Sequence, residues 1–220
     1  MANDPAEDET STPAAVRRAG RPPGPTAQGE ASRALLVDAA AAVFARLGYD
    51  RARMTDIVEA SGLSKGAVYF YFDSKEALAV AVLAARQERW ISGVAQLLSQ
   101  ADPGLPRVRA LLPAMLTLHR SDPDAWVISR LSQNLAQLEA TREVAATSMR
   151  RWIDLVAEVI QGAGTPPDVD ARELATVLVG AFDGLKMVID VVDSDPATAQ
   201  QELARGGQLL ERMLMSTIAP

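Results

Sequence analysis

The chain has 220 residues, a net charge of −6, 48% hydrophobic residues, no cysteine and one histidine, His119. These counts exclude disulfides, thiolate zinc sites and cysteine nucleophiles, and they leave too few imidazoles for a three-histidine metal site. No apolar run reaches the roughly 18 residues that a membrane span needs, and the acidic residues 1–10 are unlike a secretory signal. We therefore expect a cytoplasmic protein with no membrane segment, metal or other cofactor.

Residues 1–30 are predicted to form a disordered arm. The segment has five prolines and almost no large apolar side chain, so it cannot bury enough surface to offset the entropy of ordering. It also carries Arg17, Arg18 and Arg21. An extended arm of arginines can enter the minor groove of DNA, but a solvated linker could carry the same residues, and both interpretations stay open.

From residue 32 the sequence has the pattern of an amphipathic helix. Ser32 is a suitable N-cap, and Gly48 follows the last apolar position, as a helix end requires. Between them apolar residues recur at helical spacing and form one stripe. The stripe consists of Leu36, Ala40, Val43, Phe44 and Leu47.

Two short helices are predicted next, over residues 55–61 and 65–72. Thr55 and Ser64 are their expected N-caps. Gly62 lies between them and can supply the positive φ of a tight turn without steric strain. Two short helices joined by a three-residue turn with glycine form the helix-turn-helix arrangement.

The remainder of the chain also has a helical pattern. Ser74 is the expected cap of a long helix that runs to about residue 100. Five further helices are predicted over residues 105–119, 123–138, 142–161, 170–192 and 196–216. Pro113 lies inside one of these patterns and is expected to kink or break it. The predicted fold class is all-α, with a three-helix N-terminal domain over residues 31–76 and a C-terminal helical domain over residues 77–220.

The second short helix has the features of a recognition helix, which lies in the major groove of double-stranded DNA. Lys65 can reach guanine or phosphate, and the small Gly66 and Ala67 allow close approach. Tyrosine hydroxyls, lysine ammonium groups and helix N-termini suit phosphate oxygens. Phe70 and Phe72 are interpreted as core aromatics. The predicted DNA contacts are Thr55, Ser64, Lys65, Gly66, Ala67, Tyr69, Tyr71 and Lys75.

Residues 31–83 resemble the DNA-binding domain of TetR-family transcriptional regulators. The matching segments are FARLGY at 44–49, TDIVEASGLSKGAVY at 55–69 and FDSKEAL at 72–78. One departure is Tyr71, where many members carry histidine. The resemblance implies a homodimer on a palindromic operator and a ligand pocket among the C-terminal helices. It also implies release from DNA when a small apolar or amphipathic effector binds.

A narrower resemblance concerns the γ-butyrolactone receptors, an actinobacterial branch of that family. It rests on the segment VYFYF at 68–72, on LAVAVL at 78–83 and on Trp152. Members of this branch sense small signalling lactones. The resemblance therefore implies that the effector is a γ-butyrolactone-type signal.

Residues 77–220 contain candidates for both a pocket and a dimer face. Small-molecule sites combine apolar walls with a few polar groups. The pocket candidates of this kind are Met115, His119, Trp126, Asn134, Trp152, Phe182 and Asp183. Gly180 and Gly184 are spaced i, i+4 and would let a partner helix approach closely. The accompanying apolar candidates are Leu174, Val177, Leu178, Ala181, Leu185, Val188, Leu203, Leu210, Met213 and Leu214.

Two other classes of function stay open at this point. The head could bind a protein partner in place of DNA, and salt dependence of binding would separate these two cases. An all-α enzyme would need a nucleophile, a phosphate-binding loop or a metal cluster, and the sequence offers only Asp183 and Asp190 at helical spacing. We predict a non-enzymatic, ligand-responsive DNA-binding regulator, and specifically a repressor that a small molecule releases from its operator.

Overall fold

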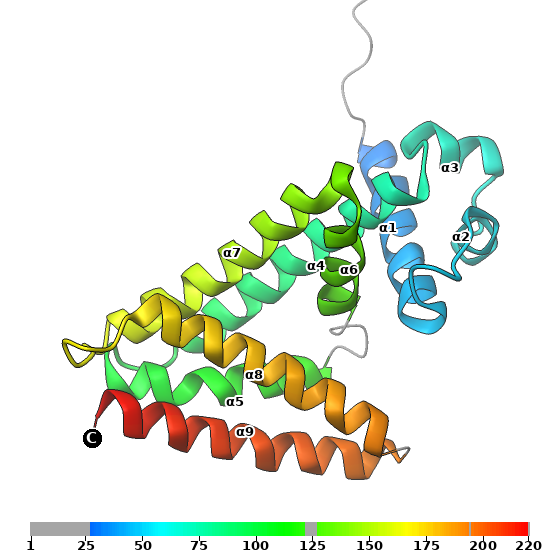
Figure 1. Ribbon diagram of the computed structural model, residues 1–220. Coiled ribbons are helices and arrows are strands. Elements are labelled where there is room, and N and C mark those ends of the chain that lie inside the picture. The colour runs from blue at the N-terminus through cyan, green and yellow to red at the C-terminus, as the bar shows by residue number, and fades with distance from the viewer. Residues whose placement is uncertain (1–26, 122–126, 194, 220) are drawn as a thin grey trace, which may run out of the picture.

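The computed structural model describes residues 27–121, 127–193 and 195–219, and in this part of the chain all regular structure is helical (Figure 1). The all-α prediction is confirmed. The helices are α1 (Ala27–Leu47), α2 (Met54–Ser61), α3 (Lys65–Tyr71), α4 (Lys75–Leu98), α5 (Leu105–Ser121), α6 (Val127–Gln137), α7 (Glu139–Gln161), α8 (Ala171–Val192) and α9 (Pro196–Ile218). Among the described residues, no helix has the length and apolar character needed to cross a membrane.

Helix α1 begins earlier than the sequence predicted. Ser32 is an internal residue whose hydroxyl donates to the Gln28 carbonyl at 3.0 Å, so its predicted N-cap role is wrong. Residues 27–30, which the sequence assigned to the arm, form the first turn of this helix. Residues 1–26, with the three arginines, lie outside the described residues. Gly48 ends the helix with φ of 75°, as predicted.

Pro113 does not break α5, which is continuous from Leu105 to Ser121. The proline is exposed, while its neighbours Leu112 and Ala114 are buried in the core. Packing on both sides therefore holds the helix together, although proline removes one backbone donor. The predicted break is wrong.

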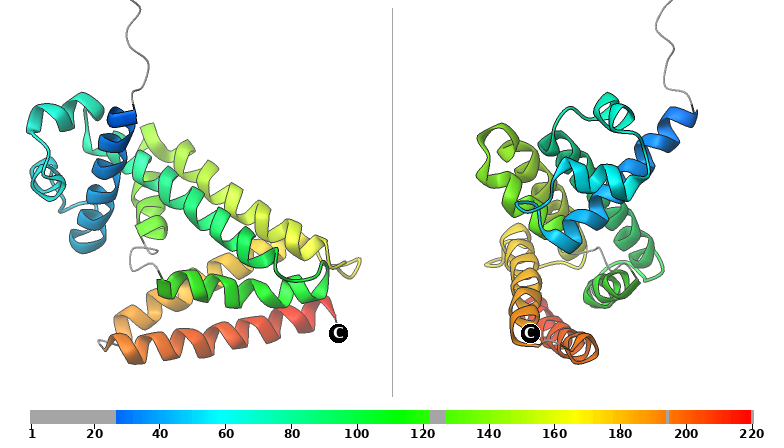
Figure 2. Two further views of the ribbon diagram at one scale, coloured as in Figure 1. Left: turned by 180° about the vertical axis from the view of Figure 1, so that it is seen from behind. Right: turned by 90° about the vertical axis from the view of Figure 1, so that its right-hand side faces the viewer.

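Apolar side chains form two clusters that share α4. The first cluster joins α1, α2, α3 and the start of α4 with α6, and it includes Leu78 and Leu83. The second joins the end of α4 with α5, α7, α8 and α9, and it includes Val94 and Leu98. In Figures 1 and 2, α4 runs from the α1–α3 head toward the base formed by α5, α8 and α9. One helix is thus part of both cores, and a shift of α4 would be felt by the head.

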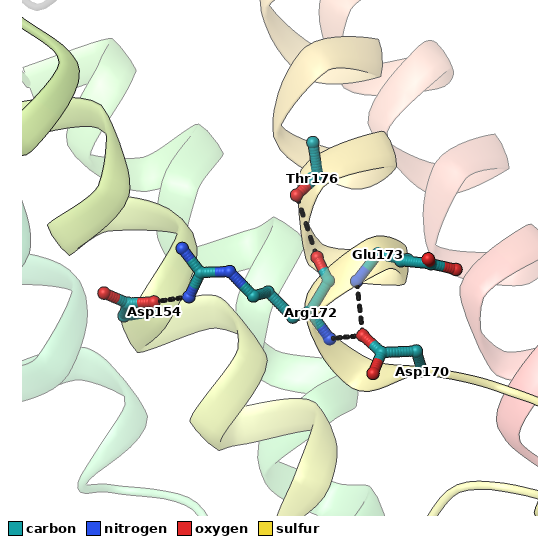
Figure 3. Close-up of polar contacts among 5 residues, drawn as sticks. All are labelled: Asp154, Asp170, Arg172, Glu173 and Thr176. Carbon is teal, nitrogen blue, oxygen red and sulfur yellow. Dashed lines mark hydrogen bonds and ion pairs between the residues drawn. The ribbon is translucent and has the colours of Figure 1, made fainter.

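Side-chain caps fix where α8 and α9 begin. A carboxylate oxygen of Asp170 accepts two backbone N–H bonds of 2.8 Å from the first turn of α8 (Figure 3). The Arg172 side chain forms an ion pair with Asp154, which ties this end of α8 to α7 (Figure 3). Asp195 accepts from the Thr198 backbone N–H at 2.9 Å and caps α9, and Pro196 occupies the first turn, where its missing N–H costs no hydrogen bond.

Two adjacent glycines let α9 lie close to both α5 and α8. A Cβ atom on Gly206 would lie 2.3 Å from Cδ2 of Leu185 in α8. A Cβ atom on Gly207 would lie 2.8 Å from Cδ1 of Leu116 in α5. Any larger residue here would have to move a packed leucine or push α9 away from its neighbours.

The outer faces of α8 and α9 expose apolar side chains. The exposed residues are Val177, Met187, Val188, Val191, Val192, Leu209 and Met213. Gly180 and Gly184 lie on α8, and a Cβ atom on either would meet nothing within 4 Å. The predicted dimer residues Leu178, Leu203 and Leu214 are instead buried in this chain's own core. Helical spacing placed these residues on two helices but did not separate the inner faces of those helices from the outer ones, and the dimer interface stays a prediction.

Candidate DNA interface and internal cavity

Helices α2 and α3 are joined by the tight turn that the sequence predicted. Gly62 adopts φ of 66° in the left-handed region, and its N–H donates to the Glu59 carbonyl at 3.3 Å. Two residues later the Ser64 hydroxyl accepts from the Ala67 backbone N–H at 3.2 Å and caps α3. Val68 is fully buried and anchors α3 on the head. The local sequence therefore sets both the turn and the orientation of α3.

Thr55 does not cap α2. The helix starts one residue earlier, with Arg53 at the N-cap, and the Arg53 backbone N–H donates to the Asp56 carboxylate at 2.8 Å. This carboxylate in the first turn supplies the charge that the helix start favours. Thr55 is exposed in the first turn of α2, so its predicted contact with the DNA backbone stays a prediction.

The outer face of α3 carries the predicted recognition residues. Lys65, Gly66 and Tyr69 are exposed, while Ala67 and Tyr71 are half-buried. The Lys65 ammonium lies 5.9 Å from the centre of the Tyr69 ring. Side chains of one helix turn thus present a positive charge and a phenol hydroxyl side by side, which suits a phosphate or a base edge.

The sequence interpretation of Phe70 as a core aromatic is wrong. Its side chain is 81% exposed, and its ring packs edge-on against Tyr71 with centroids 5.2 Å apart. Phe72 is 6% exposed, so the same interpretation is confirmed for that residue. The two phenylalanines differ because Phe70 lies on the outer face of α3, while Phe72 follows the helix and turns inward. An exposed phenylalanine on this face is an additional candidate for DNA contact.

Lys75 has a structural role that the sequence did not indicate. Its ammonium donates to the Tyr49 carbonyl at 2.9 Å and lies 4.3 Å from the centre of the Tyr49 ring. The Tyr49 hydroxyl donates to the Glu76 carboxylate at 3.1 Å. Burial and this contact raise the pKa of Tyr49, and the backbone N–H at the start of α4 lowers the pKa of Glu76. These contacts hold the loop after α1 against α4, and the predicted phosphate contact of Lys75 stays a prediction.

A small internal cavity of about 40 Å³ lies among α4, α5, α6, α7 and α8. Five of the seven predicted pocket residues line it: Met115, His119, Trp152, Phe182 and Asp183. Asn134 lines a different cavity, between α1 and α6, together with Phe44 and Tyr49. Trp126 lies outside the described residues. Asn134 is thus separated from the other candidates because its helix, α6, turns that side chain toward the head, and its predicted ligand contact stays a prediction.

Residues that the sequence analysis missed complete the cavity. They are Gln87, Trp90, Ile128, Ser129 and Met149. The rings of Trp90 and Trp152 pack edge-on with centroids 5.7 Å apart, so α4 and α7 meet at the cavity wall. A signal was present for α4, since Leu83, Gln87, Trp90 and Val94 recur at helical spacing. That stripe indicates an inward face, but it does not show which helices lie opposite.

Asp183 is the acidic group of the cavity. Its carboxylate accepts a hydrogen bond of 3.1 Å from the Ser129 hydroxyl on α6. Burial raises the pKa of Asp183 above its ordinary range, and the Ser129 bond partly opposes that shift. The described residues contain no group of three or more histidine, aspartate or glutamate side chains placed to hold a metal.

Comparison with known proteins agrees with this geometry. Residues 36–82 match the family described as "Bacterial regulatory proteins, tetR family". The chain is 30% identical over 175 residues to the A-factor receptor protein of Streptomyces griseus, a match that covers 77% of this chain and 58% of that protein. It is 24% identical over 168 residues to the HTH-type transcriptional regulator TtgR of Pseudomonas putida, which covers 72% of this chain and 80% of that protein.

A solved structure described as "Molecular basis for control of antibiotic production by a bacterial hormones" superposes with a TM-score of 0.69. It is 29% identical in sequence, and the match covers 86% of this chain and 97% of the other. A helix-turn-helix head with an exposed α3, on a helical body of this shape, defines a bacterial regulatory protein of the helix-turn-helix class. Within that class, the chain carries the DNA-binding domain of the TetR family over residues 36–82, and it resembles regulators of that kind along most of its own length.

Proposed function

We propose that the protein is a transcriptional repressor that binds a palindromic DNA operator and leaves it when a small apolar or amphipathic molecule enters the internal cavity. The observation that carries the proposal is the outer face of α3, where Lys65 and Tyr69 are exposed on a helix that its buried Val68 anchors. Such a helix can enter a major groove, and its N-terminal residues then meet base edges. The proposed activity is binding without catalysis, and the proposed location is the cytoplasm, where the operator DNA lies.

The proposed release mechanism is a shift between two populations of the head. Gln87 and Trp90 of α4 line the cavity, and Leu78 and Leu83 of the same helix pack in the head core. A ligand that prefers one position of α4 therefore prefers one position of the recognition helix. DNA affinity then falls in proportion to the difference in ligand affinity between the two states.

The active form is proposed to be a homodimer. The exposed valines of α8, with Gly180 and Gly184 among them, and Leu209 and Met213 of α9 form an apolar surface that a second copy would cover. Two helices from each subunit would make a four-helix interface. Two recognition helices can then occupy successive major grooves, about 34 Å apart.

Selection from random DNA, followed by a binding titration across salt, tests the function. We expect a two-fold symmetric preferred site, and an affinity that falls steeply with salt because phosphates are neutralised. Lys65→Ala should weaken binding about tenfold and reduce the salt slope by about one. Arg109→Ala removes one exposed positive charge from α5, away from α3, and is the matched control.

Either of two results would contradict the proposal. One is selection that returns no preferred sequence, in which case the head is better explained as a protein-binding surface. The other is equal loss of DNA affinity in Lys65→Ala and Arg109→Ala, because net charge and not α3 would then govern binding. The γ-butyrolactone-type effector stays a prediction, and the similarity to the A-factor receptor supports it.

A further inference from the structure

The cavity has one chemical feature that restricts its ligand, namely a carboxylate among aromatic side chains. Trp90, Trp152 and Phe182 line the same space as Asp183, and the other titratable side chain of the described lining is His119, with neither lysine nor arginine present. The polar partner of Asp183 in the structure is the neutral hydroxyl of Ser129. A partly buried carboxylate is stabilised by a positive charge, and the described cavity wall supplies none from a lysine or arginine.

The aromatic lining suits the same charge. Indole rings attract cations through their negative faces, and the attraction grows when the cation is desolvated. Trp152 is 6% exposed and Phe182 is 2% exposed, so a ligand that reaches them leaves water. Met115 and Met149 add unbranched thioether side chains, which adapt to irregular apolar shapes.

We propose that the cavity binds an amphipathic monocation, an apolar molecule with one protonated or quaternary nitrogen, whose charge lies between Asp183 and the tryptophans Trp90 and Trp152. The inference rests on the proposed effector site and names its ligand class. A neutral lactone brings no positive charge to the carboxylate, so this ligand class is an alternative to the γ-butyrolactone-type effector named above. A carboxylic acid would place a second negative charge beside Asp183.

The small size of the cavity links ligand binding to displacement of the side chains that line it. A volume of about 40 Å³ has room for little more than one water molecule. A ligand must therefore displace side chains, and Trp90 is the half-buried member of the tryptophan pair. Displacing Trp90 acts directly on α4, which the release mechanism requires to move.

Titration calorimetry of the full chain at pH 7 tests the ligand class with small compounds that differ in their polar group. The compounds are hexylamine, hexyltrimethylammonium, 1-hexanol, hexanoate and the neutral lactone γ-octalactone. We expect both cations to bind about tenfold or more tighter than the alcohol and the lactone, and hexanoate to bind weakest. Equal or tighter binding of the alcohol, the lactone or hexanoate would overturn the inference, as would no binding of either cation.

Three variants locate the charge selectivity. Asp183→Asn keeps the shape and a Ser129 acceptor but removes the charge, and the preference for cations should fall to within about twofold. Glu173→Gln removes an exposed carboxylate from the same helix and should keep the full preference. Ser129→Ala removes the neutral partner of Asp183, so the preference should persist or increase, and this holds even if Asp183→Asn fails to fold.

DNA binding and cation preference are measured separately, so each can fail without the other. Selective, salt-dependent DNA binding with no cation preference would sustain the regulator and reject the ligand class. An unchanged cation preference in folded Asp183→Asn would also reject the inference, because the charge would then be recognised elsewhere.

Discussion

Phe70 lies outside the hydrophobic core of the head. With 81% of its side chain exposed on the outer face of α3, it contributes little to the head core. If α3 enters the major groove, its ring is placed to contact apolar base atoms such as a thymine methyl. Phe70→Ala should lower operator affinity about fivefold, equivalent to about 1 kcal/mol, and leave the midpoint of thermal unfolding unchanged.

Val144→Ala is the control for this prediction. Val144 is 41% exposed on α7, so the substitution also trims an exposed apolar side chain, but it lies outside α3. Fluorescence anisotropy with labelled operator measures both affinities. If Phe70→Ala binds as tightly as the wild type, or if it unfolds at a lower temperature, the ring belongs to the fold and not to the interface.

The ionised carboxylate of Asp183 should lower the free energy of unfolding at neutral pH. Burial raises its pKa in the folded protein, so the ionised carboxylate opposes folding above the folded pKa, and this opposition disappears as the pH falls toward the ordinary value of 3.8. Asp183→Asn should therefore raise the free energy of unfolding by on the order of 1 kcal/mol at pH 7, with a gain that shrinks as the solution is acidified. Urea unfolding at several pH values checks this, and a gain that grows on acidification would contradict it.

At the level of helices, the close packing of α9 against α8 should require a glycine at position 206. Gly206→Ala brings a Cβ atom within 2.3 Å of Leu185, while Gly66→Ala on the exposed face of α3 meets nothing within 4 Å. Overpacking costs about 1–3 kcal/mol, and the gain in helix propensity offsets about 1 kcal/mol of it. Gly206→Ala should thus lower the free energy of unfolding by about 1–3 kcal/mol relative to Gly66→Ala, because both variants gain helix propensity and only Gly206→Ala is overpacked. Equal stabilities in chemical denaturation would show that Leu185 moves aside freely.

The helices were largely predictable because their signals are local. Gly62, Ser64 and Ser74 act where the sequence placed them, since a left-handed turn and a hydroxyl cap depend on residues at most three positions apart. Ser32 and Thr55 have the same chemistry but lie inside helices, because neighbouring residues extend the helical pattern past them. A suitable cap residue therefore marks a permitted helix start, and the surrounding pattern decides whether it is used.

The cavity was less predictable because it depends on which helices meet. Trp152, Phe182 and Asp183 were found as unusual residues in apolar stripes, but their partners Gln87 and Trp90 lie on α4, far away in the sequence. The same limit explains Asn134, since nothing local shows that α6 faces the head. Contacts between helices distant in sequence are set by packing of whole faces, which a single stripe does not specify.

For the whole molecule, a charge on the outer face of α8 or α9 should separate the proposed dimer. Val177 and Met213 are 67% and 56% exposed, so Val177→Glu and Met213→Glu should leave the subunit folded. Light scattering should then report a mass near 23.4 kDa instead of twice that value. Operator affinity should fall about 100-fold or more, because one head no longer benefits from the other. Val144→Glu on α7 should remain dimeric, and monomers of the wild type in solution would reject the interface.

Ion pairs between α4 and α1 connect the cavity to the head. The Arg86 guanidinium, which is 7% exposed, lies 3.4 Å from the Asp38 carboxylate of α1, and Arg89 lies 3.7 Å from the same carboxylate. Gln87 follows Arg86 on α4 and lines the cavity. One turn of α4 therefore contacts the ligand site on one side and the head on the other, so movement of that turn is transmitted to α1 through charge as well as through packing.

Asp38→Asn should weaken this coupling without removing either binding site. Asp38 is 59% exposed and lies in neither site, so DNA affinity without ligand and ligand affinity without DNA should each stay within about twofold of the wild type. The tightest-binding of the five calorimetry compounds reduces DNA affinity by a certain factor in the wild type. In Asp38→Asn that factor should be about fivefold smaller, which is close to 1 kcal/mol of coupling free energy. Glu88→Gln, which removes an ion pair between α4 and Arg151 of α7, is the control and should retain the full factor. Because coupling is reciprocal, the same fivefold loss must appear when ligand affinity is measured with and without operator, and unequal losses would show that the variant had altered a binding site.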